Sequence, residues 1–306
     1  RNREVPISPN RDFELGRRPY LMNFDWAEAI KAGAIFVFFL SLGVELRHEI
    51  RHGSLAKPRQ AIVPILAAVG GMLVPVLIYS AINSGLPTSV GWGVPMSTDV
   101  AFALAVLALA GRFLPKAIRV FLLTVAVVDD SLTILMIALF FASSFHILTV
   151  ASLGGVVLGL FLPGGEKFAR RLNPLANFVA LPVFVIVSLW LTFADFEGLV
   201  GGSAITAGIV IAMVLGKPIG VLGTTALVTK SGLGKLSPDI KWPDLLSIGS
   251  LFGICFTVAL MMSELSFGSE PEYHSVANVS VIIGSLTSAL LAVIALQIRK
   301  RFYVKN

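Results

Sequence analysis

Charged residues are scarce in this chain of 306 residues. Asp, Glu, Lys and Arg make up 14% of it, whereas a soluble globular domain carries about 25%. The hydrophobic share of 56% argues against a water-soluble fold. Cys255 is the only cysteine, so no disulfide can form within the chain. The short alternating strands of an outer-membrane barrel are also lacking, because the apolar residues occur in long runs.

These long apolar runs, separated by short polar loops, predict an all-α polytopic membrane protein. Basic residues gather in alternate loops, as the positive-inside rule describes. The net charge of +6 therefore reflects membrane topology and not nucleic-acid binding. The basic tail at 299–305 places the C-terminus in the cytoplasm. About nine spans are predicted, at 28–46, 60–82, 94–111, 118–142, 148–162, 175–193, 203–228, 245–263 and 277–298.

Two adjacent aspartates, Asp129 and Asp130, lie inside the apolar run from Phe121 to Phe140. A carboxylate at membrane depth costs about 3 kcal/mol on insertion scales. Neighbouring residues on a helix point about 100° apart, so one carboxylate can line an ion cavity while the other meets a different partner. We therefore expect the pair to handle cations or protons, with structural ion pairing as the alternative for either member.

A second acidic position follows a break in a predicted span. Gly91, Gly93 and Pro95 come just before Thr98 and Asp99. Unwound backbone at membrane depth is tolerated only where it lines a cavity or is buried in protein. We expect this break to form part of an ion site; the alternative is an external loop followed by an aspartate that caps a helix.

A similar break is predicted in the second half of the chain, where Gly249 and Gly253 loosen the segment 247–257. Interrupted spans at matching places in two halves of a chain are typical of transporter binding sites. Lys217, beside Pro218, is a cation within another apolar span. It is expected to pair with an intramembrane acid, unless its side chain extends to the membrane surface.

Three ionisable residues lie at the end of the first predicted span. Glu45 and Glu49 are four residues apart and share a helix face, with His48 beside them. At a cytoplasmic mouth these side chains would attract cations or respond to pH; an ordinary solvated helix end is the alternative. Glu264 closes the eighth span and is expected at the membrane interface.

Several segments together resemble the signature motifs of the NhaA-type bacterial sodium/proton antiporters. The resemblance implies two inverted three-helix repeats, about 60–142 and 203–298, whose interrupted helices cross at the membrane midplane. Residues 1–27 then form an external N-terminal loop and 28–306 the transporter domain. The family's first helix, and about two helices between Val150 and Gly154, have no counterpart here. The motifs are Phe38–Glu45, Gly70–Pro75, Thr98-Asp99, Val128-Asp129-Asp130, Gly216-Lys217-Pro218 and Gly253–Thr257.

The resemblance also implies roles for individual residues. Asp130 is similar to the family's main cation and proton carboxylate, and Asp129 to the partner of the membrane lysine, here Lys217. The two aspartates would bind Na+, with Thr98 and Asp99 supporting the site. The cytoplasmic funnel that tunes the pH response would comprise Glu45, His48 and Glu49.

The implied activity is electrogenic export of Na+ or Li+ in exchange for H+, by alternating access in the bacterial cytoplasmic (inner) membrane. It requires neither catalysis nor a cofactor, and the lipid bilayer and a second copy of the chain in a homodimer are the expected partners. A sodium-coupled solute symporter of similar fold and an inactive truncated homologue are the alternatives. An intramembrane aspartyl protease would need its aspartates on two facing helices, one in a Gly-x-Gly-Asp context, and the sequence contains no such motif.

Overall fold

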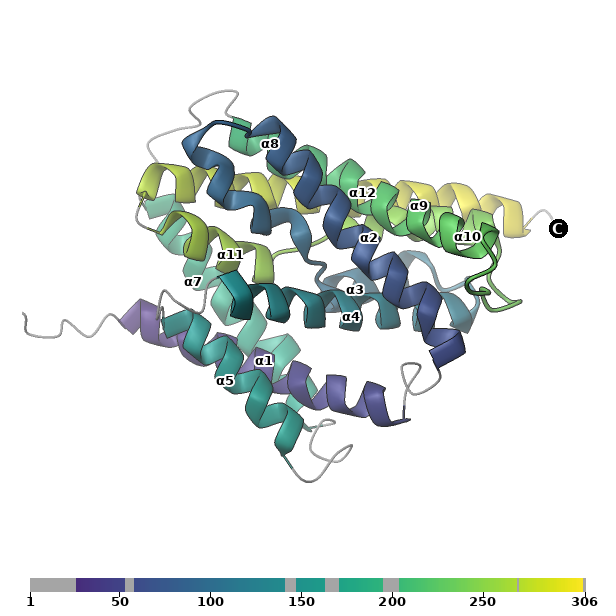
Figure 1. Ribbon diagram of the computed structural model, residues 1–306, viewed down its shortest axis with the longest axis horizontal. Helices are drawn as coiled ribbons and strands as arrows, with labels where there is room; N and C mark the ends of the chain where they lie inside the picture. Colours follow the sequence, from purple (N-terminus) through teal and green to yellow (C-terminus); the bar gives the residue numbers. More distant parts are fainter. Residues whose placement is uncertain are drawn as a thin grey trace, which may run out of the picture.

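The computed structural model describes residues 26–52, 58–140, 147–162, 171–194, 204–268 and 270–304, and every regular element within these ranges is a helix (Figure 1). The elements are α1 (Trp26–His52), α2 (Pro58–Ile82), η2 (Pro87–Met96), α3 (Val100–Ala110), α4 (Lys116–Phe140), α5 (Ile147–Phe161), η4 (Ala176–Ala180), α7 (Leu181–Ala194), α8 (Ala204–Ile211), η5 (Ala212–Gly216), α9 (Lys217–Lys230), α10 (Trp242–Ile248), η6 (Gly249–Gly253), α11 (Thr257–Phe267) and α12 (Pro271–Val304).

The predicted all-α, multi-span architecture is confirmed. Six helices in the described ranges are long and apolar enough to cross a membrane, and there are eight spans if each of two bent pairs counts as one. The predicted segment 148–162 coincides with α5, whose 15 residues are fewer than the roughly 20 that a full span needs. The count of nine spans is therefore not confirmed. The predicted N-terminal loop lies almost wholly outside the described residues.

Glycines let two pairs of helices approach closely on opposite sides of the molecule. In Figure 1, α1 and α5 lie together on one side, α2 and α9 on the other, and α4 runs between them. A Cβ atom at Gly43 would lie 2.4 Å from the carbonyl oxygen of Val156, and one at Gly159 would lie 2.4 Å from that of Leu40. Small residues at helix contacts are the usual means of close packing in membranes.

Two spans are interrupted, and the interruptions contact each other. The pair η2 and α3 is bent by 49°, and the segment Trp242–Gly253 is bent by 41° against α11. The hydroxyl of Thr98 donates to the carbonyl oxygen of Phe252 at 2.8 Å, and the backbone N–H of Asp99 donates to that of Ile254 at 2.7 Å. Each break thus satisfies backbone groups of the other, as a membrane interior requires.

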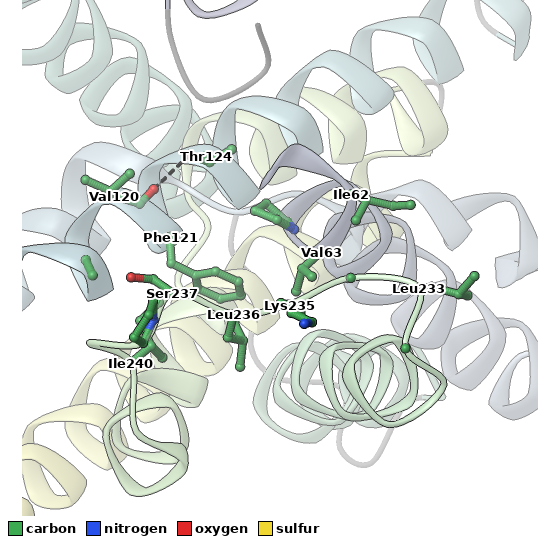
Figure 2. A pocket seen from close by; sticks show the side chains of 15 residues that line it. Ile62, Val63, Val120, Phe121, Thr124, Leu233, Lys235, Leu236, Ser237 and Ile240 are labelled. Carbon is green, nitrogen blue, oxygen red and sulfur yellow. Dashed lines mark hydrogen bonds between the residues drawn. The ribbon is translucent and has the colours of Figure 1, made fainter. Parts of the chain in front are cut away.

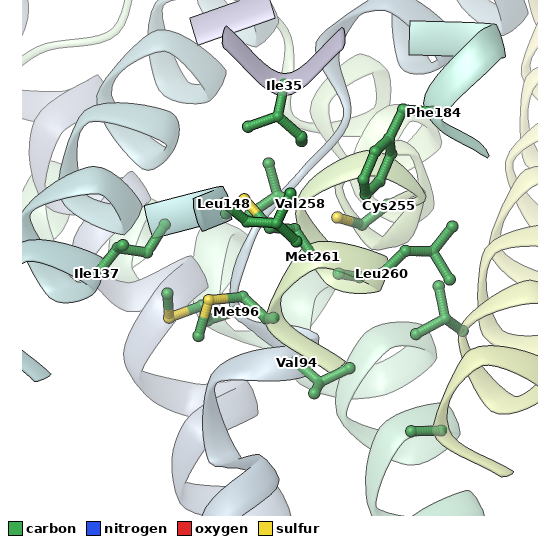
Figure 3. Close-up of a cluster of buried hydrophobic side chains, with 14 of the residues drawn as sticks. Ile35, Val94, Met96, Ile137, Leu148, Phe184, Cys255, Val258, Leu260 and Met261 are labelled. Atoms are coloured by element: carbon green, nitrogen blue, oxygen red, sulfur yellow. The ribbon is translucent and has the colours of Figure 1, made fainter. Parts of the chain in front are cut away.

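Apolar side chains enclose this crossing. Met96 from the first break and Cys255 from the second are fully buried together with Ile35 of α1 and Phe184 of α7 (Figure 3). Because these apolar side chains offer no hydrogen-bonding groups, the polar groups at the crossing must find partners other than the side chains that enclose them.

Two wide helical turns precede prolines. The π-helical segments η4 and η5 are each followed, two residues later, by a proline, Pro182 and Pro218 respectively. Proline cannot donate a helical hydrogen bond and clashes with the preceding turn, and a π turn gives the backbone room to adjust. The turn at η5 fixes where α9 begins, and Lys217 is its first residue.

Candidate functional site

The central helix α4 carries Asp129 and Asp130 at the crossing of the two interrupted spans. Both side chains are buried, with 2% and 4% exposure. They have different neighbours, as expected for consecutive helical positions. Asp129 contacts α9, whereas Asp130 contacts the first break and lines a cavity.

Asp129 forms an ion pair with Lys217. The Nζ atom of Lys217 lies 2.9 Å from Oδ2 of Asp129 and also donates a hydrogen bond to the carbonyl oxygen of Met96 in the first break. Lys217 is 1% exposed, so its side chain stays in the protein interior and does not extend to the membrane surface. The lysine therefore joins α9, α4 and the unwound backbone at one point.

Asp99 links the two interruptions. It occupies the N-cap position of α3, but its side chain makes no capping hydrogen bond there. Its Oδ2 atom instead accepts a hydrogen bond of 2.9 Å from the hydroxyl of Thr257 and one of 3.4 Å from the Thr257 backbone N–H. Thr257 begins α11, so this carboxylate lies at the positive end of the other interrupted helix.

Asp130 faces a small cavity. Its Oδ1 atom accepts a hydrogen bond of 3.3 Å from the hydroxyl of Ser97, a residue that the sequence analysis did not single out. The cavity has a volume of about 210 Å³ and is also lined by Asp99 and Glu45. Among the ion pairs found in the described ranges, none involves Asp130.

The three ionisable residues near the end of α1 differ in their position relative to the cavity. Glu45, His48 and Glu49 are all half-buried on α1. Glu45 lines the cavity that reaches Asp130, whereas His48 and Glu49 lie on the same helix beyond its lining. The structure thus brings Glu45, Asp99 and Asp130 to the lining of one cavity, whereas Asp129, Lys217 and Thr98 are outside that lining.

The ligand atoms at this site are oxygens of carboxylates, hydroxyls and backbone carbonyls. Such oxygens suit hard cations. Within the described ranges no three His, Cys, Asp or Glu side chains come together as a ligand set for a metal ion. The arrangement therefore offers Asp130 as a carboxylate that can hold either a proton or a small cation.

A larger pocket lies elsewhere. It has a volume of about 1010 Å³ and is formed by α2, α4 and the loop between α9 and α10, with Val63, Phe121 and Leu236 in its walls (Figure 2). Lys235 is the one titratable residue in its lining. None of the predicted site residues lines this pocket, so pocket size alone would have pointed away from the buried carboxylates.

Two further ion pairs were missed by the sequence analysis. Lys31 pairs with Glu264, which was expected at the membrane interface. Lys31 is a lone cation in an apolar span, so the reasoning applied to Lys217 would have found it. The buried Asp244 accepts hydrogen bonds from Nε of Arg299 at 2.7 Å and from the hydroxyl of Tyr303 at 3.0 Å. No local signal in the sequence connects these positions.

Comparison with known proteins identifies the family. The family model described as Na+/H+ antiporter 1 matches residues 10–164 and 149–296. A protein of Arthrobacter sp. (strain FB24) named Na(+)/H(+) antiporter NhaA is 35% identical, over 96% of this chain and 78% of its own length. Proteins of the same name from Frankia casuarinae and Thermobifida fusca are 35% and 33% identical, over 95% and 96% of this chain and 79% and 86% of their own lengths.

The alignments also show a difference in length from these relatives. The Arthrobacter alignment extends over 362 positions, more than the 306 residues of this chain, so the relative contains residues without a counterpart here. The two matches to the family model overlap at 149–164, and this range includes Val150 to Gly154, where about two helices were expected to be missing. With the family model matching most of its length, this chain belongs to the Na+/H+ antiporter 1 family.

Proposed function

We propose that this protein exchanges sodium or lithium ions for protons across the bacterial cytoplasmic membrane, with Asp130 as the carboxylate that carries either ion. The observation that supports this most directly is the position of Asp130. It is a buried acid at the crossing of two interrupted helices, it faces a cavity, and it has no basic partner among the described residues. The relatives named sodium/proton antiporters support the same activity.

The neighbouring charges keep the roles of the two aspartates distinct. Lys217 neutralises Asp129, so Asp129 contributes oxygen atoms beside the ion without adding a second uncompensated charge. Thr98 and Asp99 hold the two breaks together through Phe252 and Thr257. The ion at Asp130 is thus surrounded by fixed dipoles and needs little rearrangement of the protein to bind.

Exchange follows from competition for one site. Sodium and protons cannot occupy the Asp130 carboxylate together, so the site crosses the membrane loaded with one or the other. More than one proton per sodium makes the cycle electrogenic, and the proton gradient then drives sodium out. Basic residues at 299–301 support a cytoplasmic C-terminus, and Glu45 belongs to the cavity mouth on that side.

The element order supports the proposed repeats. The first repeat comprises α2, the bent pair of η2 and α3, and α4. The second comprises α8 to α9, the bent segment from α10 to α11, and α12. Each unit therefore has a bent span between two long ones. An inverted relation between these units would place both breaks at the same membrane depth, where the contacts between Thr98 and Phe252 and between Asp99 and Thr257 occur.

The test is sodium-driven proton movement in everted vesicles or proteoliposomes, followed by a pH-sensitive dye with no organic solute present. The wild type should release protons when Na+ or Li+ is added, and Asp130→Asn should not. Asp239→Asn, which removes an exposed acid outside the site, is the matched control and should retain exchange. Full exchange in Asp130→Asn would overturn the assignment. A silent wild type that is folded and inserted would instead favour the inactive homologue.

A further inference from the structure

The cavity in front of Asp130 is lined by more than carboxylates. Its walls come from α1, α3 and α4 and from the helical segment that begins at Arg171 and leads into η4. Ser41, Asn173 and Asn177 add three neutral polar side chains to Glu45 and Asp130. The exchange proposed at Asp130 does not use these three residues.

Two of these side chains are fixed relative to each other. The hydroxyl of Ser41 on α1 donates a hydrogen bond of 2.7 Å to Oδ1 of Asn173, and Ser41 is buried. Asn177 follows Asn173 by four residues and lines the same cavity, as expected for positions about one helical turn apart. Two amide groups and one hydroxyl therefore belong to the lining of the cavity that also contains Glu45 and Asp130.

Helix packing alone does not explain these amides. Asparagine is a poor residue for a helix interior, and Asn177 lies within the predicted span 175–193, where polar side chains are costly. The neighbours of Asn177 on the same segment are Phe178 and Val179, both exposed apolar residues of the kind that faces lipid. Asn173 is half-buried and Asn177 is exposed on part of its surface, yet both carry amides where their neighbours are apolar, and both line the cavity, which indicates a role in that cavity.

We propose that Glu45, Asn173 and Asn177 bind a sodium ion at a second position, through which the ion passes before it reaches Asp130. Sodium is a hard cation that is suited to carboxylate and carbonyl oxygens. One carboxylate and neutral ligands bind it weakly, which permits transfer, since conduction through several sites requires each to release its ion. Amide oxygens do not take up protons near neutral pH, so Glu45 is the one proposed ligand at this position that a proton can occupy in place of sodium. This proposal rests on the proposed exchange at Asp130.

The transport test compares the dependence of exchange on sodium concentration. Asn177→Leu and Asn173→Leu should raise the KM for Na+ about tenfold, the effect of losing one ligand to a charged group, with little change in the maximal rate. Asn177→Asp, which keeps an oxygen at that point, should keep the KM near or below that of the wild type. Leu175→Asn adds an amide on the same segment outside the cavity lining and should leave the KM unchanged. An unchanged KM in both leucine variants would overturn the proposal.

A binding test separates this position from Asp130 and does not require transport. Purified Asp130→Asn protein should still broaden the sodium-23 NMR line, because the second position remains. The double variant Asp130→Asn/Asn177→Leu should lose that broadening. Equal broadening in the two variants would show that the amides do not bind sodium. If Asp130→Asn loses exchange but still broadens the line, the result shows that Asp130 is needed for exchange and that sodium binds at the second position without it.

Discussion

Lys31 near the start of α1 and Glu264 near the end of α11 form an ion pair that connects α1 to one of the interrupted helices. Their side chains are 7% and 14% exposed. The first residue of α11 is Thr257, which holds Asp99. The pair therefore connects α1, which carries Glu45, to the helix that begins beside the candidate ion site.

Removing one member of this pair should destabilise the protein. Lys31→Met leaves the carboxylate of Glu264 poorly solvated and unpaired, at an expected cost of about 3–5 kcal/mol. Thermal unfolding in detergent measures the change. The double variant Lys31→Met/Glu264→Leu removes both charges and should recover most of the loss. A single variant as stable as the wild type would show that Glu264 is adequately hydrated without Lys31.

The pair of Lys217 and Asp129 should respond differently. Lys217→Met leaves Asp129 unpaired and takes a donor from the carbonyl of Met96, so we expect a loss of about 3–5 kcal/mol. The companion variant Lys217→Met/Asp129→Asn should regain stability, but exchange should stay impaired because an oxygen ligand beside Asp130 has changed its charge. Thermal unfolding and the vesicle assay together check both parts. Normal exchange in the stable double variant would contradict the role given to Asp129.

A pair of glycines on α9 tests the packing against α2. A Cβ atom at Gly220 would lie 2.2 Å from the carbonyl oxygen of Gly70, whereas one at Gly223 meets nothing within 4 Å. Gly220→Ala should force the helices apart and cost about 1–3 kcal/mol. Gly223→Ala should be neutral or stabilise by up to about 1 kcal/mol. Similar melting temperatures for the two variants would refute close contact of α2 and α9.

Competition at Asp130 sets the sign of the pH dependence. Acidification increases the fraction of sites that hold a proton, so the apparent KM for Na+ should rise as the pH falls. The rise approaches about tenfold per pH unit for each proton that one sodium ion displaces. Exchange measured at several pH values and sodium concentrations gives this slope. A KM that does not change while the maximal rate falls would instead indicate regulation away from the ion site.

The charged residues of the candidate site could be picked out from the sequence because each is a local anomaly. Asp129, Asp130 and Lys217 lie in apolar runs, and Thr98 and Asp99 follow glycines and a proline. Each can therefore be recognised from a short stretch of sequence around it. Their partners were harder to predict. Asp99 and Thr257 are 158 residues apart, and Lys31 and Glu264 are 233 residues apart. The spacing of apolar residues along the sequence does not predict such pairs, since they depend on how the helices are placed in space.

The cavity illustrates the same limit. Asn177 lies in the predicted span 175–193 and Asn173 just before it, and neither stood out there; Ser41 is one of many small polar residues. Only the packing of α1 against that segment brings them in front of Asp130. Conversely, the adjacent aspartates could be assigned different partners from helical geometry alone, but which of them would meet Lys217 came from the resemblance to the family.

The contact between the two breaks also has a consequence for biosynthesis. Thr98 and the carbonyl group it binds are 154 residues apart. At about 5–20 residues per second, a ribosome makes the second segment roughly 8–30 s after the first. During that interval the unwound backbone of the first break lacks its native partners. A chain of this kind must therefore keep its first half shielded, by the insertion machinery or by water, until its second half has been delivered.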